Sequence, residues 1–321
     1  MADQGDRDPG LFRFEPELFG SRVEAPRPQP RNSPWALMGV VVALAAVLVV
    51  VAMPGRGSQV VEGTPLAAPG PVRDNKPNAA APPSTAGPKV PSQVGPESNE
   101  LLIPGRSLPQ VTCKMPAFGK SAAQLQAYYQ AMIDCLGQAW QPVLAEASEP
   151  YRAPKLVVDD EPTTSCGVPS TQIAVAFYCP RDETIFMPRN RVVESMGANQ
   201  GGHIMVLAHE YGHHVQQLSG ISLGMSRKMR GMQEDAPEFL ELTRRMELQA
   251  DCFSGMFISA ASGRGSISKT LGTSAGNAFR SSVTDNTHGT VKHQTQWGTT
   301  GVKNNNTSFC NTWVVPASEV S

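Results

Sequence analysis

Residues 207–215 of this 321-residue chain read LAHEYGHHV. His209 and His213 are four residues apart, so on a helix their side chains lie one above the other on one face. That spacing lets two imidazoles bind one tetrahedral metal ion, while Glu210 can reach a metal-bound water without ligating the metal. The stretch therefore predicts a zinc-binding helix over about residues 203–218 that carries its own general base. The alternative is a surface helix with two solvated histidines.

Other residues of this helix are expected to pack rather than to bind metal. His203 and His214 lie off the face that His209 and His213 share, so we expect both to make packing or supporting contacts. Gly212 is a poor residue for a helix interior, costing roughly 1 kcal/mol relative to Ala. A second backbone that approaches this face closely would explain the glycine.

The third zinc ligand must come from elsewhere, since a catalytic zinc needs three protein ligands and an open position for water. In the metzincin pattern this ligand would be a histidine six residues after His213, with a glycine at position 216. The chain has Gln216 and Ser219 at these places, so the metzincin class is excluded. A carboxylate from a later helix is the remaining choice.

Residues 244–254 read RRMELQADCFS and lie in a second predicted helix, from about 237 to 261. Glu247 and Asp251 are four residues apart and share a helical face. Glu247 would complete a site of two histidines and one glutamate, and Asp251 would accept a hydrogen bond from the second nitrogen of a ligand histidine. Such acidic pairs are ordinary on solvated helices, but this pair follows a His-Glu-x-x-His motif.

The charge balance excludes a broad nucleic-acid surface. The chain has 27 Lys and Arg against 28 Asp and Glu, whereas binding to phosphates requires many unopposed cations. The length allows one or two domains. Much of the N-terminal half is rich in Pro and Gly, so we do not expect it to belong to a packed core.

Residues 35–53 read WALMGVVVALAAVLVVVAM, and no charged residue lies between Arg31 and Arg56. About 20 apolar residues in a helix cross a hydrocarbon core of roughly 30 Å, so this run predicts a transmembrane anchor. A buried globular helix would show a polar face, which the run lacks. A cleaved signal peptide would begin nearer the first residue and end at a small-residue site, whereas this run ends at Met53 and Pro54.

The arginines around the anchor predict its orientation. Three precede it closely and only Arg56 follows closely, which places residues 1–34 in the cytoplasm as a disordered tail. Residues 54–110 are dominated by Pro, Gly, Ala and Ser and predict an extended linker outside the cytoplasm. Residues 111–321 have a globular composition and are predicted to form the catalytic domain.

The order of elements in this domain predicts an α+β fold. Ser121 and Gln124 resemble a capping box that opens a first helix. Strand candidates follow at 156–158, 173–178 and 184–187. The two motif-bearing helices come after them, so we expect a small sheet with helices that carry the chemistry.

The six cysteines all lie after residue 110, on the predicted oxidising side of the membrane, where disulfides persist. We expect each to pair with its neighbour in the chain, because the pairs would tie the N-terminal arm to the first helix, join two strand candidates, and fasten the C-terminal segment beside the metal. These pairs are Cys113–Cys135, Cys166–Cys179 and Cys252–Cys310. The alternative for Cys252 is a buried free thiol.

Several stretches resemble the putative neutral zinc metallopeptidase family of bacteria. They are NQGGHIMVLAHEYGHHVQQLSGI (199–221), RRMELQADCFSGMF (244–257), THGTVKHQTQWGTTG (287–301) and, more weakly, TSCGVPSTQIAVAFYCPRDETIFM (164–187). The resemblance covers about residues 111–313. It implies a gluzincin-like fold, one zinc ion per chain, and the roles given above to His209, Glu210, His213, Glu247 and Asp251.

The chain departs from the family pattern in two places. The family often carries Gly-Asp-Asp ahead of its Thr-His-Gly, where this chain reads SAGNAFRSS (274–282). An arginine-rich run usual before the tryptophan is HQTQ (293–296) here. These changes leave the predicted zinc ligands intact and leave the substrate contacts open.

Together these features predict a membrane-anchored, extracytoplasmic zinc metalloendopeptidase that acts on peptides or proteins, with Glu210 as general base for a zinc-activated water. His288 is a candidate donor to the oxyanion, its alternative being a structural or exposed histidine. An edge strand normally holds the peptide in such sites, and we assign this role to residues 184–187. The alternative function is a catalytically silent, zinc-containing envelope protein that binds or scaffolds; such a site has no use for the Glu210 carboxylate.

Overall fold

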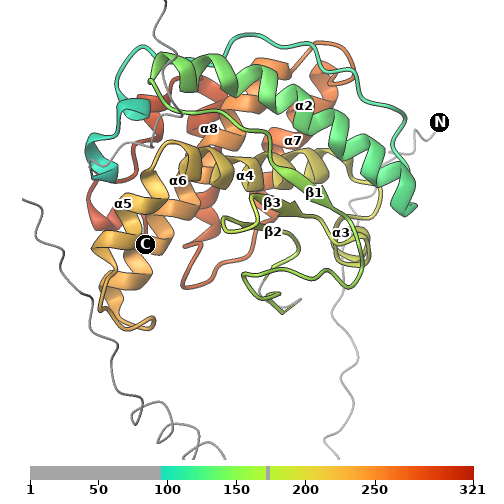
Figure 1. The fold of residues 1–321 in the computed structure, drawn as a ribbon. Helices are drawn as coiled ribbons and strands as arrows, with labels where there is room; N and C mark the ends of the chain where they lie inside the picture. The colour runs from blue at the N-terminus through green and yellow to red at the C-terminus, as the bar shows by residue number, and fades with distance from the viewer. Residues whose placement is uncertain (1–94, 171–173) are drawn as a thin grey trace, which may run out of the picture. The chain divides into compact units, whose positions relative to one another are not determined.

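The computed structural model describes residues 95–170 and 174–321 of the chain (Figure 1). The tail predicted over residues 1–34, the anchor predicted over 35–53 and residues 54–94 of the predicted linker lie outside the described residues. Among the helices that the structure describes, none is long and apolar enough to span a bilayer.

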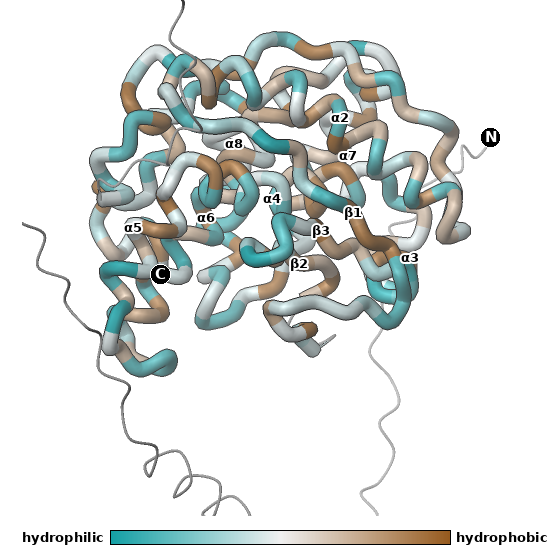
Figure 2. The backbone as a smooth tube through the Cα atoms, in the orientation of Figure 1, coloured by the Kyte–Doolittle hydropathy of each residue, from teal (hydrophilic) through white to brown (hydrophobic). Residues whose placement is uncertain are grey.

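The described residues form an α+β domain in which a small sheet packs against α2 and α4, as the predicted fold class requires. The apolar stretches alternate with hydrophilic ones along the helices (Figure 2), as expected for helices that bury one face. In chain order the elements are η1 (Pro96–Ser98), η2 (Glu100–Leu102), α2 (Ala122–Glu146), β1 (Lys155–Val157), β2 (Phe177–Cys179), β3 (Thr184–Phe186), α3 (Arg189–Met196), α4 (Gln200–Leu218), α5 (Ile221–Lys228), α6 (Pro237–Ala261), α7 (Lys269–Ala278), η3 (Phe279–Ser281), α8 (Val291–Asn304), η4 (Thr307–Cys310) and η5 (Ala317–Glu319).

The sheet has the strand order β1-β3-β2, with β1 parallel and β2 antiparallel to β3. Each strand overlaps one of the three predicted strands. Because β3 forms hydrogen bonds with a strand on either side, its backbone groups are already paired, and it cannot hold a substrate peptide. The assignment of residues 184–187 as the substrate-binding edge was therefore wrong, and β2 is the edge strand on that side of the sheet.

Helices α4 and α6 pack closely against each other, and this contact brings the two sequence motifs together. A Cβ atom added to Gly212 would lie 3.1 Å from Cα and 3.2 Å from the carbonyl oxygen of Ala250. Those distances are tighter than a side chain normally tolerates, so the glycine is there because the α6 backbone approaches it. On the other side of α6, a Cβ at Gly301 of α8 would lie 1.9 Å from the Cys252 carbonyl oxygen. Glycines thus set the spacing of the three-helix core.

The packed domain begins earlier in the chain than the predicted boundary between residues 110 and 111. Leu101, Leu102 and Leu108 are buried in the core, and the Asn99 side chain donates a hydrogen bond to the carbonyl oxygen of Ser219 at the end of α4 (2.8 Å). These contacts come from a short apolar segment inside a Pro-rich stretch. The average composition of the stretch did not reveal that this segment packs on the domain.

Three disulfides link the cysteines as expected, namely Cys113–Cys135, Cys166–Cys179 and Cys252–Cys310. The alternative of a free thiol at Cys252 was wrong. The third bond joins α6, one residue after Asp251, to η4 across 58 residues of chain. Closing a loop of that length restricts the unfolded chain and so favours the folded state.

A buried histidine connects the start of α4 to α2. His203 is fully buried, and its Nε2–H donates to the carbonyl oxygen of Gly197 (3.2 Å). A carbonyl can only accept, so Nδ1 carries no proton and accepts from the Tyr129 hydroxyl (2.5 Å). Burial lowers the pKa of His203. The ring is therefore neutral in the folded protein and packs as expected from its place off the ligand face.

This neutral histidine should make the domain sensitive to acid. In the unfolded chain a histidine takes up a proton as the pH falls through about 6.5, whereas folded His203 resists protonation. The unfolded state then binds more protons, so stability is fully present above pH 6.5 and falls below it, by at most about 1.4 kcal/mol per pH unit for one group. Urea unfolding from pH 7.5 to 5.0 should show His203→Gln less stable than wild type, by a margin that shrinks on acidification. A constant margin would contradict this account.

Candidate active site

Three side chains from α4 and α6 converge on one point. The Nε2 atoms of His209 and His213 are 3.1 Å apart, and Oε2 of Glu247 lies 3.2 Å from the first and 3.1 Å from the second. Ligand atoms about 2.0 Å from a tetrahedral zinc ion lie roughly 3.3 Å from one another. The three observed separations are close to that value, and two imidazoles with one carboxylate are a common donor set for catalytic zinc. The residues present therefore fit the ion that the motif predicts.

The charges of these groups point to the same conclusion. Burial opposes charge on His209, but its hydrogen bonds with Asp251 and Glu247 raise its pKa well above the usual value. Burial would raise the pKa of Glu247, yet the neighbouring His213, His288 and His209 hold it well below its ordinary range. The ligand rings must be neutral to bind a metal, so a dication and a proton would compete for Nε2 of each ring.

Hydrogen bonds fix both ligand histidines in the tautomer that a metal requires. Nδ1–H of His209 donates to Oδ1 of Asp251 (2.8 Å), and Nδ1–H of His213 donates to Oε1 of Gln216 (2.9 Å). Both Nε2 atoms are therefore left with their lone pairs directed at the shared point. The sequence predicted the contact of Asp251. It missed Gln216, although this residue lies three positions after His213 on the same helix.

Replacing Asp251 with Asn should weaken zinc binding. The amide can still accept from His209, but it lacks the negative charge that makes the ring a stronger donor to the metal. Loss of such a partner typically costs 10- to 100-fold in metal affinity. Competition with a chromophoric chelator would measure the change, with Asp134→Asn as control, because Asp134 is an exposed residue on α2. Equal zinc affinity in Asp251→Asn and wild type would mean that Asp251 does not support a zinc ligand.

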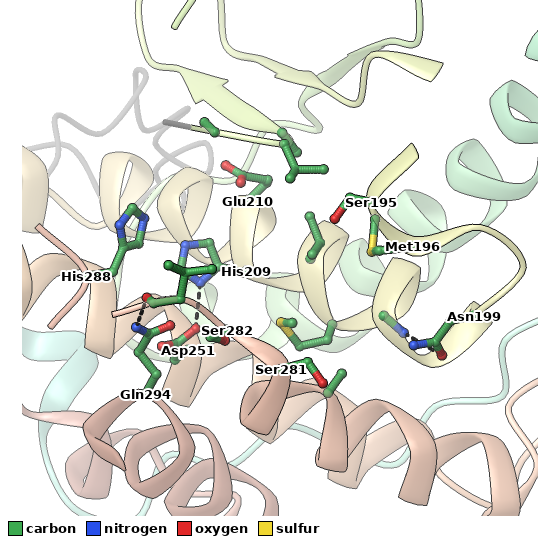
Figure 3. A pocket seen from close by; sticks show the side chains of 18 of the residues that line it. Ser195, Met196, Asn199, His209, Glu210, Asp251, Ser281, Ser282, His288 and Gln294 are labelled. Carbon is green, nitrogen blue, oxygen red and sulfur yellow. Dashed lines mark hydrogen bonds and ion pairs between the residues drawn. The ribbon is translucent and has the colours of Figure 1, made fainter. Parts of the chain in front are cut away.

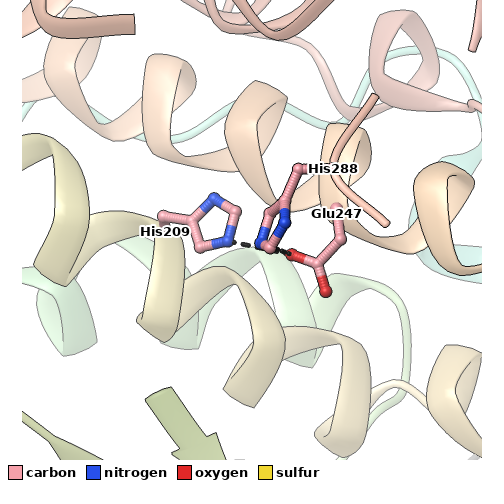
Figure 4. A group of neighbouring side chains, drawn as sticks. All are labelled: His209, Glu247 and His288. Carbon is pink, nitrogen blue, oxygen red and sulfur yellow. Dashed lines mark hydrogen bonds and ion pairs between the residues drawn. The ribbon is translucent and has the colours of Figure 1, made fainter. Parts of the chain in front are cut away.

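A fourth side chain, His288, approaches the same point from the loop before α8 (Figure 4). Its Nε2 is 3.5 Å from Oε2 of Glu247, and His209, Glu247 and His288 offer ligand atoms within 4.8 Å of one another. His213 makes the tighter triangle with His209 and Glu247. His288 is therefore placed either to join the ligands or to face a substrate bound at the metal.

Asp285 orients His288, and the sequence analysis did not predict this contact. Its Oδ2 accepts from Nδ1–H of His288 (2.9 Å), and its Oδ1 accepts from the backbone N–H groups of Thr287 (2.7 Å) and His288 (2.6 Å). The carboxylate thus fixes both the loop and the ring, and it directs Nε2 of His288 toward the site. Its position three residues before the histidine of the Thr-His-Gly block was the available signal.

Glu210 lies beside the three converging groups at the junction of two cavities. The cavities have volumes of about 440 and 380 Å³, and His209, Glu210 and His288 line both of them. Figure 3 shows these three residues around the same end of the larger cavity. Burial raises the pKa of Glu210, and a raised pKa favours a carboxyl as a general base near neutral pH.

The segment just before β2 borders both cavities, and the edge strand β2 itself borders the smaller one. Ala174 and Ala176, just before β2, line the two of them, and Tyr178 in β2 lines the smaller. The Tyr178 hydroxyl donates to Nδ1 of His214 (2.9 Å), whose Nε2–H donates to the carbonyl oxygen of Arg152 (2.7 Å). His214 is therefore a supporting residue, as expected, and it ties the edge strand to the helix that carries the motif.

Residues 104–313 match the family described as putative neutral zinc metallopeptidase. Uncharacterized protein YpfJ of Escherichia coli (strain K12) is 32% identical over 198 residues, which cover 54% of this chain and 66% of that protein. Uncharacterized protein Rv2575 of Mycobacterium tuberculosis (strain ATCC 25618 / H37Rv) is 29% identical over 175 residues, covering 52% of this chain and 53% of that protein. Each match spans less than two thirds of the relative's length. No solved structure matches the chain. Because the family match includes the converging residues and covers more than half of the sequence, the chain belongs to the putative neutral zinc metallopeptidase family.

Proposed function

We propose that this protein is a zinc metalloendopeptidase that holds one zinc ion per chain and hydrolyses peptide bonds in peptides or proteins. The observation that carries this proposal is the triangle formed by His209, His213 and Glu247, with the buried carboxylate of Glu210 beside it in an open cleft. A structural zinc site has four protein ligands and needs no additional carboxylate. A hydrolytic site needs three ligands and a base.

The residues divide the chemical work between them. Zinc held by the two histidines and Glu247 would polarise the scissile carbonyl and lower the pKa of the attacking water. Glu210 takes a proton from the attacking water at its carboxylate and passes it to the leaving amine. In its doubly protonated form His288 keeps Nδ1–H on Asp285 and donates Nε2–H to the scissile carbonyl oxygen as negative charge develops there.

The shape of the cleft supports an endopeptidase that holds an extended chain. A peptide laid beside β2 would pair with the edge of the described sheet, and Ala174 and Ala176, just before β2, line both cavities next to Glu210. Two cavities that share Glu210 leave room for substrate residues on both sides of the cleaved bond, which supports an endopeptidase.

We further infer that the domain is tethered outside the cytoplasm by a helix over residues 35–53. The apolar run of the sequence and the three disulfides of the domain support this location, since disulfides persist in oxidising compartments. Protease treatment of intact cells that express the full chain should degrade the domain and spare a tag on residue 1. Protection of the domain in intact cells would contradict the inferred orientation.

A catalytically silent zinc protein is the second candidate, because His288 lies near enough to Glu247 to close the site as a fourth ligand. The two functions are separated by incubating the full chain, purified in mild detergent and loaded with zinc, with a mixture of denatured proteins. Mass spectrometry should find new peptide termini that a zinc chelator prevents. Bound zinc with no cleavage would favour the silent protein.

A further inference from the structure

We infer that the larger of the two cavities beside Glu210 selects a large apolar side chain next to the cleaved bond and disfavours acidic side chains. This inference rests on the proposed peptidase function and adds the class of substrate.

The walls of the larger cavity are mainly apolar and come from several elements. Its apolar contributors include Ala176, Met196, Met205, Val206, Ala278 and Val283. Val206 lies one helical turn before Glu210 on the same face of α4, so it borders the cavity directly beside the base. An apolar side chain that enters beside Val206 therefore contacts apolar surface, and burying it is favourable by about 25 cal/mol per Å².

The cavity is long enough for a large side chain. It follows α4 from His209 back to Gly202, which is about 10 Å at the helical rise, and its volume is about 440 Å³. The end away from His288 is formed by uncharged residues, among them Ser195, Met196 and Asn199 (Figure 3). A phenylalanine, leucine or methionine can extend along this space, whereas an alanine would leave it largely unfilled.

The larger cavity disfavours both kinds of ionised side chain. Among the described residues that line the two cavities there is no Lys or Arg, and the carboxylates are those of Glu210, Glu247, Asp251 and Asp285. An Asp or Glu of the substrate that extends along the larger cavity, away from the zinc ligands, would lose hydration there without a Lys or Arg to pair with. A Lys would reach an uncharged end of the cavity and lose hydration there without gaining a partner.

The test compares substrates and two matched variants of the full chain in detergent. Mapping cleavage sites in denatured proteins should show large apolar residues enriched, and Asp and Glu depleted, at one position flanking the cut. Peptides that vary this residue through Phe, Leu, Ala, Lys and Glu then give kcat/KM. Phe should exceed Ala by at least about tenfold, the lower end of what differences in hydrophobic pocket filling produce.

Filling the cavity should weaken the preference for Phe over Ala. In Val206→Trp, and in smaller measure in Val206→Leu, the ratio of Phe to Ala should fall by about tenfold or more. Val314→Trp makes the same change at a residue that is 65% exposed and does not line the cleft, so its ratio should stay that of wild type. Active enzyme with no apolar preference, or a ratio unmoved in folded Val206→Trp, would overturn the inference.

A binding measurement separates failure of this inference from failure of the proposed function. Fluorescence anisotropy with zinc-loaded Glu210→Gln should show a Phe-containing peptide binding at least about tenfold more tightly than its Glu-containing counterpart. The Val206→Trp change should remove that difference. If the wild type cleaves nothing but the difference is present, the cavity is selective and the peptidase proposal fails. If the wild type cleaves and no difference is found, the cavity inference fails alone.

Discussion

Replacing Glu210 with Gln is expected to lower kcat/KM for peptide hydrolysis by about 10²- to 10⁴-fold, the usual contribution of a general base, while zinc stays bound. The amide keeps the size of the side chain but cannot take a proton from water. Because Glu210 is not one of the converging ligand groups and its pKa is raised by burial, a neutral side chain should leave the fold and the zinc affinity nearly unchanged. Peptide cleavage rates and zinc content, measured on the same preparation, check both halves of the expectation.

The matched control is Glu146→Gln at the end of α2, an exposed residue that lines neither cavity. It should cleave peptides at the rate of wild type. A Glu210→Gln protein that keeps most of its activity would assign the base to another residue. Loss of zinc together with activity would mean that Glu210 supports the metal instead.

The second large effect separates the two histidines that could accompany His209 and Glu247. His213→Ala removes one corner of the tighter triangle and should weaken zinc binding by more than about 100-fold, the upper limit seen on losing a mere hydrogen-bond partner of a ligand. His288→Ala should change zinc affinity by only a few fold, but it should lower kcat by about 10²- to 10³-fold, as loss of one oxyanion donor does.

Chelator competition and steady-state kinetics on the two variants decide the ligand set. If His288→Ala lost zinc and His213→Ala kept it, the ion would be held by His209, Glu247 and His288. No residue would then remain as a candidate hydrogen-bond donor to the oxyanion. If both lost zinc, a site closed by four ligands would favour the silent protein over the peptidase.

Local signals explain why the main helices could be predicted from the sequence. The α2 helix begins after Ser121, whose hydroxyl accepts from the Gln124 backbone N–H while the Gln124 side chain accepts from the Ser121 backbone. Asn199 caps α4 through the backbone N–H of Gly202 (3.3 Å), and Pro237 occupies the first turn of α6. Each signal acts within one turn of chain, so it can be read without knowing the fold.

The remaining helices depend on contacts that the sequence does not display. The α8 segment is VKHQTQWGTTGVKN and α7 is KTLGTSAGNA, and both are rich in Gly and Thr, which are poor helix formers. Packing stabilises them instead, and in α8 the close approach of Gly301 to α6 requires the residue that lowers helix propensity. Tertiary contact therefore outweighs local preference in these segments, and no periodic pattern predicted them.

Some features of the candidate site likewise follow from local spacing, and others depend on tertiary contacts. The helical spacing of His209 with His213 and of Glu247 with Asp251 could be predicted because each pair lies on one helix. Other features could not be predicted in this way. Asp285 contacts His288 through the conformation of a loop, and β2 lies at the sheet edge because of how distant segments meet. Neither the strand order nor a loop conformation follows from spacing, which is why the edge strand was assigned incorrectly.

The most direct test of the central claim is the zinc content of the full chain, purified in detergent with its disulfides intact and dialysed against metal-free buffer. Elemental analysis should find one zinc ion per wild-type chain and a large loss in Glu247→Ala, with both proteins folded by circular dichroism. A folded, oxidised wild-type protein that binds no zinc when the ion is supplied would contradict the account.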